Sequence, residues 1–148
     1  MNILVTGGTG FIGSHTIVSL LNEGHHVITF DNFYNSKETV VEAIEHITGK
    51  SFVFYRADMT QPELLEKIFR ENQIDCVIHF AGYKAVGESV EMPLSYYHNN
   101  VYGTLCLLEK MKQHGVSVPQ LPSTGSRSRF RFGRIFRLAL RTRMAEQS

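Results

Sequence analysis

The chain has 148 residues, of which 43% are hydrophobic and 20% charged, a composition typical of a soluble globular protein with one core. No apolar run reaches the roughly 18 residues of a membrane-spanning helix, and "MNILVTGG" lacks the basic start of a secretory signal, so we expect neither. Cys76 and Cys106 lie in apolar segments and no His or Cys spacing is typical of zinc, so we expect reduced thiols, a cytoplasmic location and no metal.

The net charge of +1 conceals two segments of opposite sign. Residues 1–116 carry 8 Lys and Arg against 13 Asp and Glu, whereas residues 117–148 carry 7 Arg, no Lys and one acid, Glu146. Such a change in composition indicates a boundary between a folded domain and a separate segment. We therefore expect a domain over 1–116 and an Arg-rich tail over 117–148.

Strand-like and helix-like patterns alternate along the first segment. In chain order they predict strand 2–6, helix 11–24, strand 26–31, helix 36–49, strand 51–58, helix 60–72, strand 74–82 and helix 93–114. Ser36 and Thr60 are the expected N-caps of their helices, and Gly24 and Gly49 the expected stops. Pro62 falls in a first helical turn, where proline is tolerated.

This alternation predicts an α/β fold with a doubly wound, Rossmann-like parallel sheet and helices on both faces. A fifth strand is expected after Gly115, but Pro119 and Pro122 remove hydrogen-bond donors that a central strand needs. We therefore expect the sheet to be incomplete and the basic tail to be irregular.

The loop "VTGGTGFIGSH" joins the first strand to the first helix and spaces Gly7, Gly10 and Gly13 three residues apart. In dinucleotide-binding folds the first glycine allows the tight turn, the second lets the backbone approach a pyrophosphate, and the third lets the helix pack closely. The helix N-terminus then offers free N–H groups to the phosphates. The alternative is a glycine-rich turn with no ligand.

Carboxylates and small residues follow the other strands at the same edge of the sheet, where ligands bind in open α/β folds. Asp31 ends the second strand, where a carboxylate binds ribose hydroxyls and repels a 2′-phosphate, favouring NAD over NADP; alternatively it is a turn residue. Asp58 is a candidate adenine contact or a helix cap, and Lys84 a candidate pyrophosphate contact or a solvated side chain. Ala81 and Gly82 are small enough for close approach of a ligand.

The segments "TGGTGFIGSHT", "DNFYNS" and above all "HFAGYKAVGESVEMPLSYYHNNVYGTL" resemble the UDP-glucose 4-epimerases of the extended short-chain dehydrogenase/reductase superfamily. The resemblance covers residues 1–116 and only the N-terminal part of such an enzyme. It implies a bound NAD that takes hydride from C4 of a UDP-hexose and returns it to the other face, in galactose metabolism. A homodimer is possible by the same resemblance, and nucleic acid is not an expected partner.

The same resemblance implies a set of cofactor-binding residues. They are Gly7, Gly10, Phe11, Ile12 and Gly13 in the loop, Asp31, Asn32, Phe33, Asn35 and Ser36 after the second strand, Asp58 and Met59 after the third, Phe80, Ala81, Gly82, Tyr83 and Lys84 after the fourth, and Asn99. The sequence departs from the family pattern at Phe33, Tyr34 and Tyr83. The bulkier side chains at these positions are expected to crowd the adenosine side or the substrate side of the binding site. Tyr96 and Tyr97 are expected in the core or at an interface.

No catalytic residue is assigned. The family uses a Tyr with a Lys four residues later, which lowers the phenol pKa so that the tyrosine can act as a base. No Tyr-x-x-x-Lys occurs in the 148 residues, and the sugar-nucleotide domain has no counterpart among them. The chain is therefore expected to be an inactive, truncated form.

The sequence leaves three interpretations of the tail over 117–148. A change of reading frame near residue 117 would explain the abrupt loss of family pattern, the Arg-rich composition and the short length. A recruited basic segment with interleaved aromatic residues would instead bind anionic partners, making the chain a nucleotide-binding or interaction module. A divergent native end is the third alternative.

Overall fold

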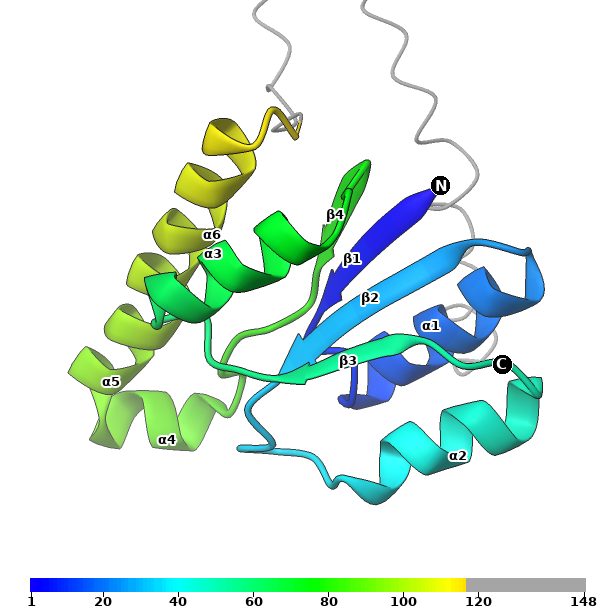
Figure 1. The fold of residues 1–148 in the computed structure, drawn as a ribbon. Helices are drawn as coiled ribbons and strands as arrows, with labels where there is room; N and C mark the ends of the chain where they lie inside the picture. Colours follow the sequence, from blue (N-terminus) through cyan, green and yellow to red (C-terminus); the bar gives the residue numbers. More distant parts are fainter. Residues whose placement is uncertain (117–148) are drawn as a thin grey trace, which may run out of the picture. The chain divides into compact units, whose positions relative to one another are not determined.

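The computed structural model describes residues 1–116 and consists of a parallel sheet with helices on both faces (Figure 1). The four strands have the order β3-β2-β1-β4 and all neighbours are parallel. The elements are β1 Asn2–Thr6, α1 Phe11–Asn22, β2 His26–Asp31, α2 Thr39–Thr48, β3 Val53–Arg56, α3 Pro62–Glu71, β4 Cys76–His79, α4 Val86–Glu91, α5 Pro93–Tyr97, the π-helix η1 His98–Tyr102 and α6 Gly103–Gln113. The predicted doubly wound α/β class is thereby confirmed.

Each face of the sheet has its own hydrophobic core, because alternate residues of a strand point to opposite faces. On one face, Ile3 and Val5 pack with Ile17 and other buried residues of α1 and α2. On the other face, Leu4 packs with residues of α3 and α6 such as Leu65. Figure 1 shows α1 and α2 on one side of the sheet and α3 and α6 on the other.

The two central strands are buried except at their ends, whereas the two edge strands are shorter than predicted. In β1 and β2, Ile3 to Val5 and Val27 to Ile28 are fully buried. β3 spans only Val53–Arg56 and β4 only Cys76–His79. Of the flanking predicted residues, Ala57, Asp75 and Phe80 still donate backbone hydrogen bonds to the neighbouring central strands. The expected fifth strand and the basic tail lie outside the described residues.

Two predicted N-caps are wrong. α2 begins at Thr39 rather than after Ser36, whose hydroxyl instead bonds to Asp31 and Thr9. α3 begins at Pro62 after Gln61, and Thr60 donates its hydroxyl hydrogen to the carboxylate of Asp58. In both segments the hydroxyl donates to a carboxylate that follows the preceding strand, and the helix itself starts further along the chain, at Thr39 and at Pro62.

The helix predicted over 93–114 is observed as a continuous helical run with a π-helical turn, η1, between α5 and α6. The short helix α4 precedes it and was not predicted, because "VGESVE" has no periodic apolar face. Such π-turns place side chains at functional sites more often than elsewhere in helices. Here the turn contains Asn99 and Asn100, which face the loop after β4.

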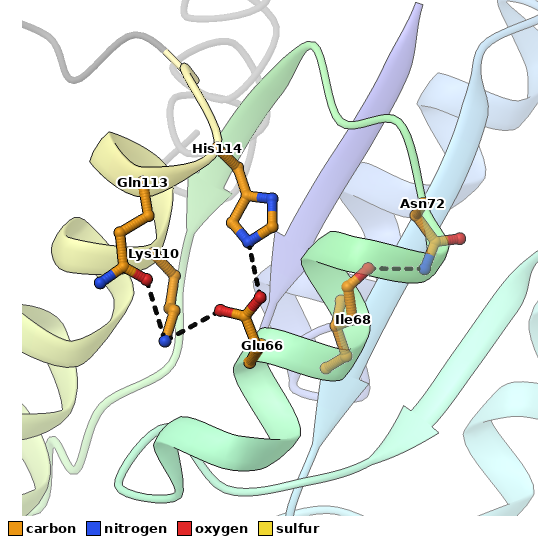
Figure 2. Close-up of polar contacts among 6 residues, drawn as sticks. All are labelled: Glu66, Ile68, Asn72, Lys110, Gln113 and His114. Atoms are coloured by element: carbon orange, nitrogen blue, oxygen red, sulfur yellow. Dashed lines mark hydrogen bonds and ion pairs between the residues drawn. The ribbon is translucent and has the colours of Figure 1, made fainter.

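Helices α3 and α6 are joined by an ion-pair cluster (Figure 2). The ammonium of Lys110 donates to Glu66 Oε2 at 2.9 Å and to Gln113 Oε1 at 3.0 Å, and His114 Nε2 lies 3.1 Å from Glu66 Oε1. The hydrogen bond from Lys110, followed by that from His114, holds the pKa of Glu66 below its usual range despite the opposing effect of desolvation. The cluster fixes the two helices against each other on one face of the sheet.

Candidate functional site

A cavity of about 370 Å³ opens at the carboxyl ends of the four strands, a volume within the usual range for small-ligand sites. Its walls come from the glycine loop after β1 and from the segments that follow β2, β3 and β4, with one residue from η1. The lining residues are Gly7, Gly10, Phe11, Ile12, Gly13, Phe30, Asp31, Asn32, Tyr34, Asn35, Ser36, Ala57, Asp58, Met59, Phe80, Ala81, Gly82, Tyr83, Lys84, Ala85 and Asn99. Of the 18 residues predicted from sequence, only Phe33 does not line the cavity.

Three glycines of the loop have no room for a side chain, two because they lie against backbone and one because it lies against a side chain. Gly7 has a left-handed φ of +68°, and a Cβ on it would lie 2.7 Å from the backbone nitrogen of Ala81. A Cβ on Gly13 would overlap the backbone of Gly7 and Gly8, so the first turn of α1 can pack on the loop only without a side chain. Gly8 was not singled out from the sequence, yet a Cβ there would overlap the buried side chain of Thr29.

Helix α1 begins at the cavity with its first-turn N–H groups uncapped by any side chain in the described residues. Gly10 precedes the helix in an extended conformation, and no acidic residue occupies the first turn. Phe11 and Ile12 of that turn line the cavity. Free N–H groups and the positive end of the helix dipole favour an anionic ligand group at this point.

The carboxylate of Asp31 connects the end of β2 to the glycine loop. Its Oδ2 atom accepts a hydrogen bond from the Thr9 N–H at 3.2 Å, and its Oδ1 atom accepts from the Phe33 N–H at 2.9 Å. The hydroxyl of Ser36 lies 3.3 Å from Oδ1 and 2.6 Å from the Thr9 hydroxyl. Asp31 therefore orders the turn after β2 and also lines the cavity, and its contact with a ribose stays a prediction.

Phe33 is not brought to the cavity. Its backbone has a left-handed φ of +58°, and its N–H donates a hydrogen bond to the carboxylate of Asp31. Its ring packs 5.3 Å from that of Phe54, with the guanidinium of Arg56 5.6 Å from its centroid. This left-handed backbone conformation directs the Phe33 side chain away from the cavity. The sequence does not predict it, because phenylalanine rarely adopts a positive φ.

Asp58 is held on both carboxylate oxygens by the chain itself. Oδ1 accepts from the N–H and hydroxyl of Thr60 at 2.8 and 2.7 Å, and Oδ2 accepts from the amide of Asn32 at 2.8 Å. Burial opposes ionisation of Asp58, but the hydrogen bonds from Thr60 and Asn32 outweigh it and lower the pKa of Asp58. Asp58 is thus an ionised cavity residue that also orders the turn before α3.

The loop after β4 is fixed by two polar anchors. The hydroxyl oxygen of Thr6 accepts hydrogen bonds from the N–H groups of Phe80 and Ala81, both at 3.2 Å, and lies 2.6 Å from His79 Nδ1. The amide of Asn100 binds both the N–H and the carbonyl of Tyr83, at 2.8 and 2.9 Å. These anchors hold Ala81 against Gly7, so the loop forms one wall of the cavity.

Four lining residues were not in the predicted set, namely Phe30, Tyr34, Ala57 and Ala85. Each is a chain neighbour of a predicted residue, so their positions follow from the strand ends alone. Asn100 was also missed, although its pairing with Asn99 in "HNN" was visible. Lys84 lies exposed at the cavity and makes no hydrogen bond or ion pair within residues 1–116, so its two alternatives stay open.

Comparison with known proteins identifies the family of this chain. The family model described as GDP-mannose 4,6 dehydratase matches residues 4–132, which is most of the chain. This chain belongs to that family.

Sequence comparison finds UDP-glucose 4-epimerases among the relatives of this chain, which confirms the resemblance seen in the motifs. The enzyme of Neisseria meningitidis serogroup A is 57% identical over 115 residues, covering 78% of this chain and 34% of the relative. That of Bacillus subtilis is 53% identical over 116 residues, with the same two coverages of 78% and 34%. The chain therefore spans about a third of the length of the curated relatives it matches.

Solved structures of UDP-glucose 4-epimerases have the same fold. The enzyme of Bifidobacterium longum, in complex with NAD+ and UDP, superposes with a TM-score of 0.77 at 40% identity, covering 98% of this chain and 50% of that one. The enzyme of Thermus thermophilus, in complex with NAD, gives a TM-score of 0.72 at 34% identity and covers 87% of this chain and 43% of that one.

Metal-binding and membrane-spanning features are both absent from the described part of the chain. Within residues 1–116 no three His, Cys, Asp or Glu side chains are placed to hold a metal ion. None of the helices in that range is long and apolar enough to cross a membrane.

Proposed function

We propose that residues 1–116 bind NAD in the cavity at the carboxyl ends of the strands. The observation that carries this proposal is the junction of the glycine loop with Asp31, in which Thr9 donates to the carboxylate and α1 begins two residues further on. This junction combines an anion-binding helix terminus with a carboxylate acceptor for ribose hydroxyls.

The residues fit a dinucleotide in chemistry as well as in place. Gly10, Phe11 and Ile12 would hold the pyrophosphate with backbone N–H groups, and Asp31 would accept from ribose hydroxyls. Asp58 and Met59 would flank the adenine, while Phe80 to Lys84 would lie along the other side. When bound, the nicotinamide supplies reversible hydride transfer. Asp31 would disfavour a 2′-phosphate by charge repulsion, which supports NAD over NADP.

For the reaction, we propose that the chain corresponds to the cofactor-binding part of a UDP-glucose 4-epimerase and does not interconvert UDP-glucose and UDP-galactose by itself. The described residues provide no base for the C4 hydroxyl, since no Tyr-x-x-x-Lys occurs anywhere in the sequence. UDP-hexose binding would need residues beyond the cavity wall described here. The reduced thiols of Cys76 and Cys106 fit a cytoplasmic location.

We further propose that the chain associates as a homodimer through the exposed side of α5, η1 and α6. Leu94, Tyr97, Val101 and Leu105 are between 51% and 82% exposed and follow one another at helical spacing. A stripe of this kind on a surface helix is typical of an interface between chains. Light scattering of the wild-type chain and of Leu94→Glu should then give a dimer and a monomer, respectively.

Equilibrium dialysis of the purified full chain against NAD, followed by release of nucleotide on denaturation, tests the cofactor assignment. We expect one NAD per chain and weaker binding of NADP. Absence of bound NAD from a chain with a cooperative melting transition would contradict the assignment. An assay for UDP-galactose formation, run beside a no-enzyme control, should show no turnover by this chain.

A further inference from the structure

Three tyrosine rings meet at the cavity in the described structure. The ring of Tyr34 lies 4.4 Å from that of Tyr83 with an interplanar angle of 30°, and Tyr83 contacts the edge of Tyr96 at 5.3 Å and 64°. Tyr34 and Tyr83 both line the cavity. Two of these positions, 34 and 83, are among those at which the sequence departs from the epimerase pattern.

One carboxylate joins two of these tyrosines. Glu88 Oε1 accepts a hydrogen bond from the Tyr34 hydroxyl at 2.6 Å, and Glu88 Oε2 accepts from the Tyr96 hydroxyl at 2.8 Å. Hydrogen bonds to an ionised acceptor are shorter and stronger than neutral ones. We call Tyr34, Tyr83, Glu88 and Tyr96 the tyrosine strap.

The protonation states suit these bonds. The hydrogen bond to Glu88 raises the pKa of Tyr34 to about 12, so the phenol remains a donor at neutral pH. The same bond, with the one from Tyr96, lowers the pKa of Glu88, which therefore remains an acceptor. At neutral pH Tyr34 is therefore protonated and Glu88 ionised, as their hydrogen bond requires.

The strap crosses the cavity because of where its residues enter the sheet. Tyr34 belongs to the loop after β2, whereas Tyr83, Glu88 and Tyr96 follow β4. β2 and β4 flank β1 on opposite sides, so a contact between their following segments spans the carboxyl end of β1 and the glycine loop there. Figure 1 shows the loop after β2 reaching the start of α4.

The two ends of the strap differ in how firmly they are held. Tyr96 is buried, with 9% of its surface exposed, and Asn100 clamps the backbone of Tyr83 on both sides. Tyr34 is 48% exposed and stands on a loop. The Tyr34–Glu88 hydrogen bond is therefore the contact that can open while the rest of the strap stays in place.

We propose that the tyrosine strap is a gate that closes over the dinucleotide site and must open at Tyr34 for NAD to enter or leave. The proposal rests on the proposed NAD site. Its contacts use only the chain's own atoms, so a gate of this kind slows association and dissociation alike. A residue that merely touched the cofactor would alter dissociation and affinity, with little effect on association.

The test compares Tyr34→Phe with the wild-type full chain in stopped-flow measurements of NAD binding and release. Phenylalanine keeps the ring on Tyr83 and removes only the hydroxyl. We expect both rate constants to rise by roughly three- to tenfold, with a much smaller change in the dissociation constant. Glu88→Gln, which weakens both acceptors, should change the rates in the same direction.

Tyr55→Phe is the matched control. Tyr55 also donates to a glutamate, Glu71 Oε2 at 2.9 Å, but it does not line the cavity. Its removal should leave both rates unchanged. If Tyr34→Phe and Tyr55→Phe release and bind NAD at the wild-type rates, or if only dissociation changes, the gate is overturned.

Hydrogen exchange without nucleotide separates failure of the gate from failure of the cofactor assignment. Tyr34→Phe should accelerate amide exchange in residues 32–36 relative to wild type, and Tyr55→Phe should not. Faster exchange in a chain that binds no NAD would show that Tyr34 holds the loop closed, but it would overturn the role of the strap as a gate for NAD together with the NAD assignment. Unchanged exchange in Tyr34→Phe would reject the gate whatever the nucleotide result.

Discussion

The Oδ2 atom of Asp31 accepts a hydrogen bond from the N–H of Thr9 at 3.2 Å, so the carboxylate that ends β2 also orders the glycine loop after β1. The other oxygen binds the Phe33 N–H and the Ser36 hydroxyl. One side chain therefore sets the distance between the anion-binding end of α1 and the proposed ribose position. Any ligand that uses both must match that spacing.

Replacing Asp31 by Asn removes the negative charge with little change in shape. We expect NAD affinity to fall by roughly tenfold or more and the preference over NADP to shrink, because the charged acceptor and the repulsion of a 2′-phosphate are both lost. Titration with NAD and NADP measures both effects. Asp75→Asn is the control, since Asp75 accepts from the Asn2 N–H at 2.6 Å, remote from the cavity. An unchanged ratio of the two affinities in Asp31→Asn would count against the ribose assignment.

A methyl group at Gly13 would overlap the backbone of Gly7 and Gly8, so Gly13→Ala should separate α1 from the loop. Overpacking against backbone costs about 1–3 kcal/mol, and we expect the free energy of unfolding to fall by that amount. Denaturant unfolding measures it. Gly87→Ala is the comparison, because a Cβ there meets nothing within 4 Å and the helix α4 would gain from alanine. Equal stability of the two variants would show that α1 does not need Gly13.

Thr6→Val tests the anchor of the loop after β4. Valine keeps the shape but leaves the N–H of Ala81 and the Nδ1 atom of His79 without the hydroxyl that binds them. Unsatisfied buried groups cost about 1–3 kcal/mol, so we expect lower stability and, because the cavity wall loosens, weaker NAD binding. Thr16→Val removes an exposed hydroxyl that bonds within α1 and should change neither. Wild-type stability in Thr6→Val would exclude this anchor.

Partial burial, followed by the charge of Lys84, lowers the pKa of His79. The neutral ring can then accept the Thr6 hydroxyl proton at Nδ1 and donate from Nε2 to the Thr104 hydroxyl, 3.2 Å away. This pattern assigns the proton to Nε2. Nitrogen chemical shifts of the imidazole should report that tautomer at neutral pH, whereas the opposite tautomer would break the Thr6 anchor as described.

The ion-pair cluster around Glu66 predicts that the free energy of unfolding decreases at acid pH. The pKa of Glu66 is lower in the folded chain than the ordinary value of about 4.3, chiefly because Lys110 donates to it. Its contribution is therefore complete above that ordinary value and is lost as pH falls through the lower, folded value. Thermal unfolding below pH 5 should show a shallower loss of stability in Glu66→Gln than in wild type. Glu63→Gln, on the same helix but without an ion pair within residues 1–116, should retain the wild-type slope.

Much of this molecule follows from patterns that are local in the chain. The alternation of apolar strands and amphipathic helices determined the doubly wound sheet, because each pattern can bury its apolar side in only one kind of layer. The same alternation placed the strand ends at one edge, and 17 of the 18 predicted site residues line the cavity there. The spacing of the glycines in 7–13 was informative because close backbone contact leaves no room for a side chain at Gly7 and Gly13.

The structure decided several details that the sequence patterns did not predict. Ser36 and Thr60 do not cap their helices, which start further along the chain, and their hydroxyls donate to the carboxylates of Asp31 and Asp58. Phe33 leaves the cavity through a backbone inversion, and the π-turn brings Asn100 onto the backbone of Tyr83. The bond between Tyr34 and Glu88 joins residues 54 positions apart, and no periodicity encodes a contact between the loop after β2 and the first turn of α4. Such contacts arise because the strand order places β2 and β4 on either side of β1, which only the assembled sheet establishes.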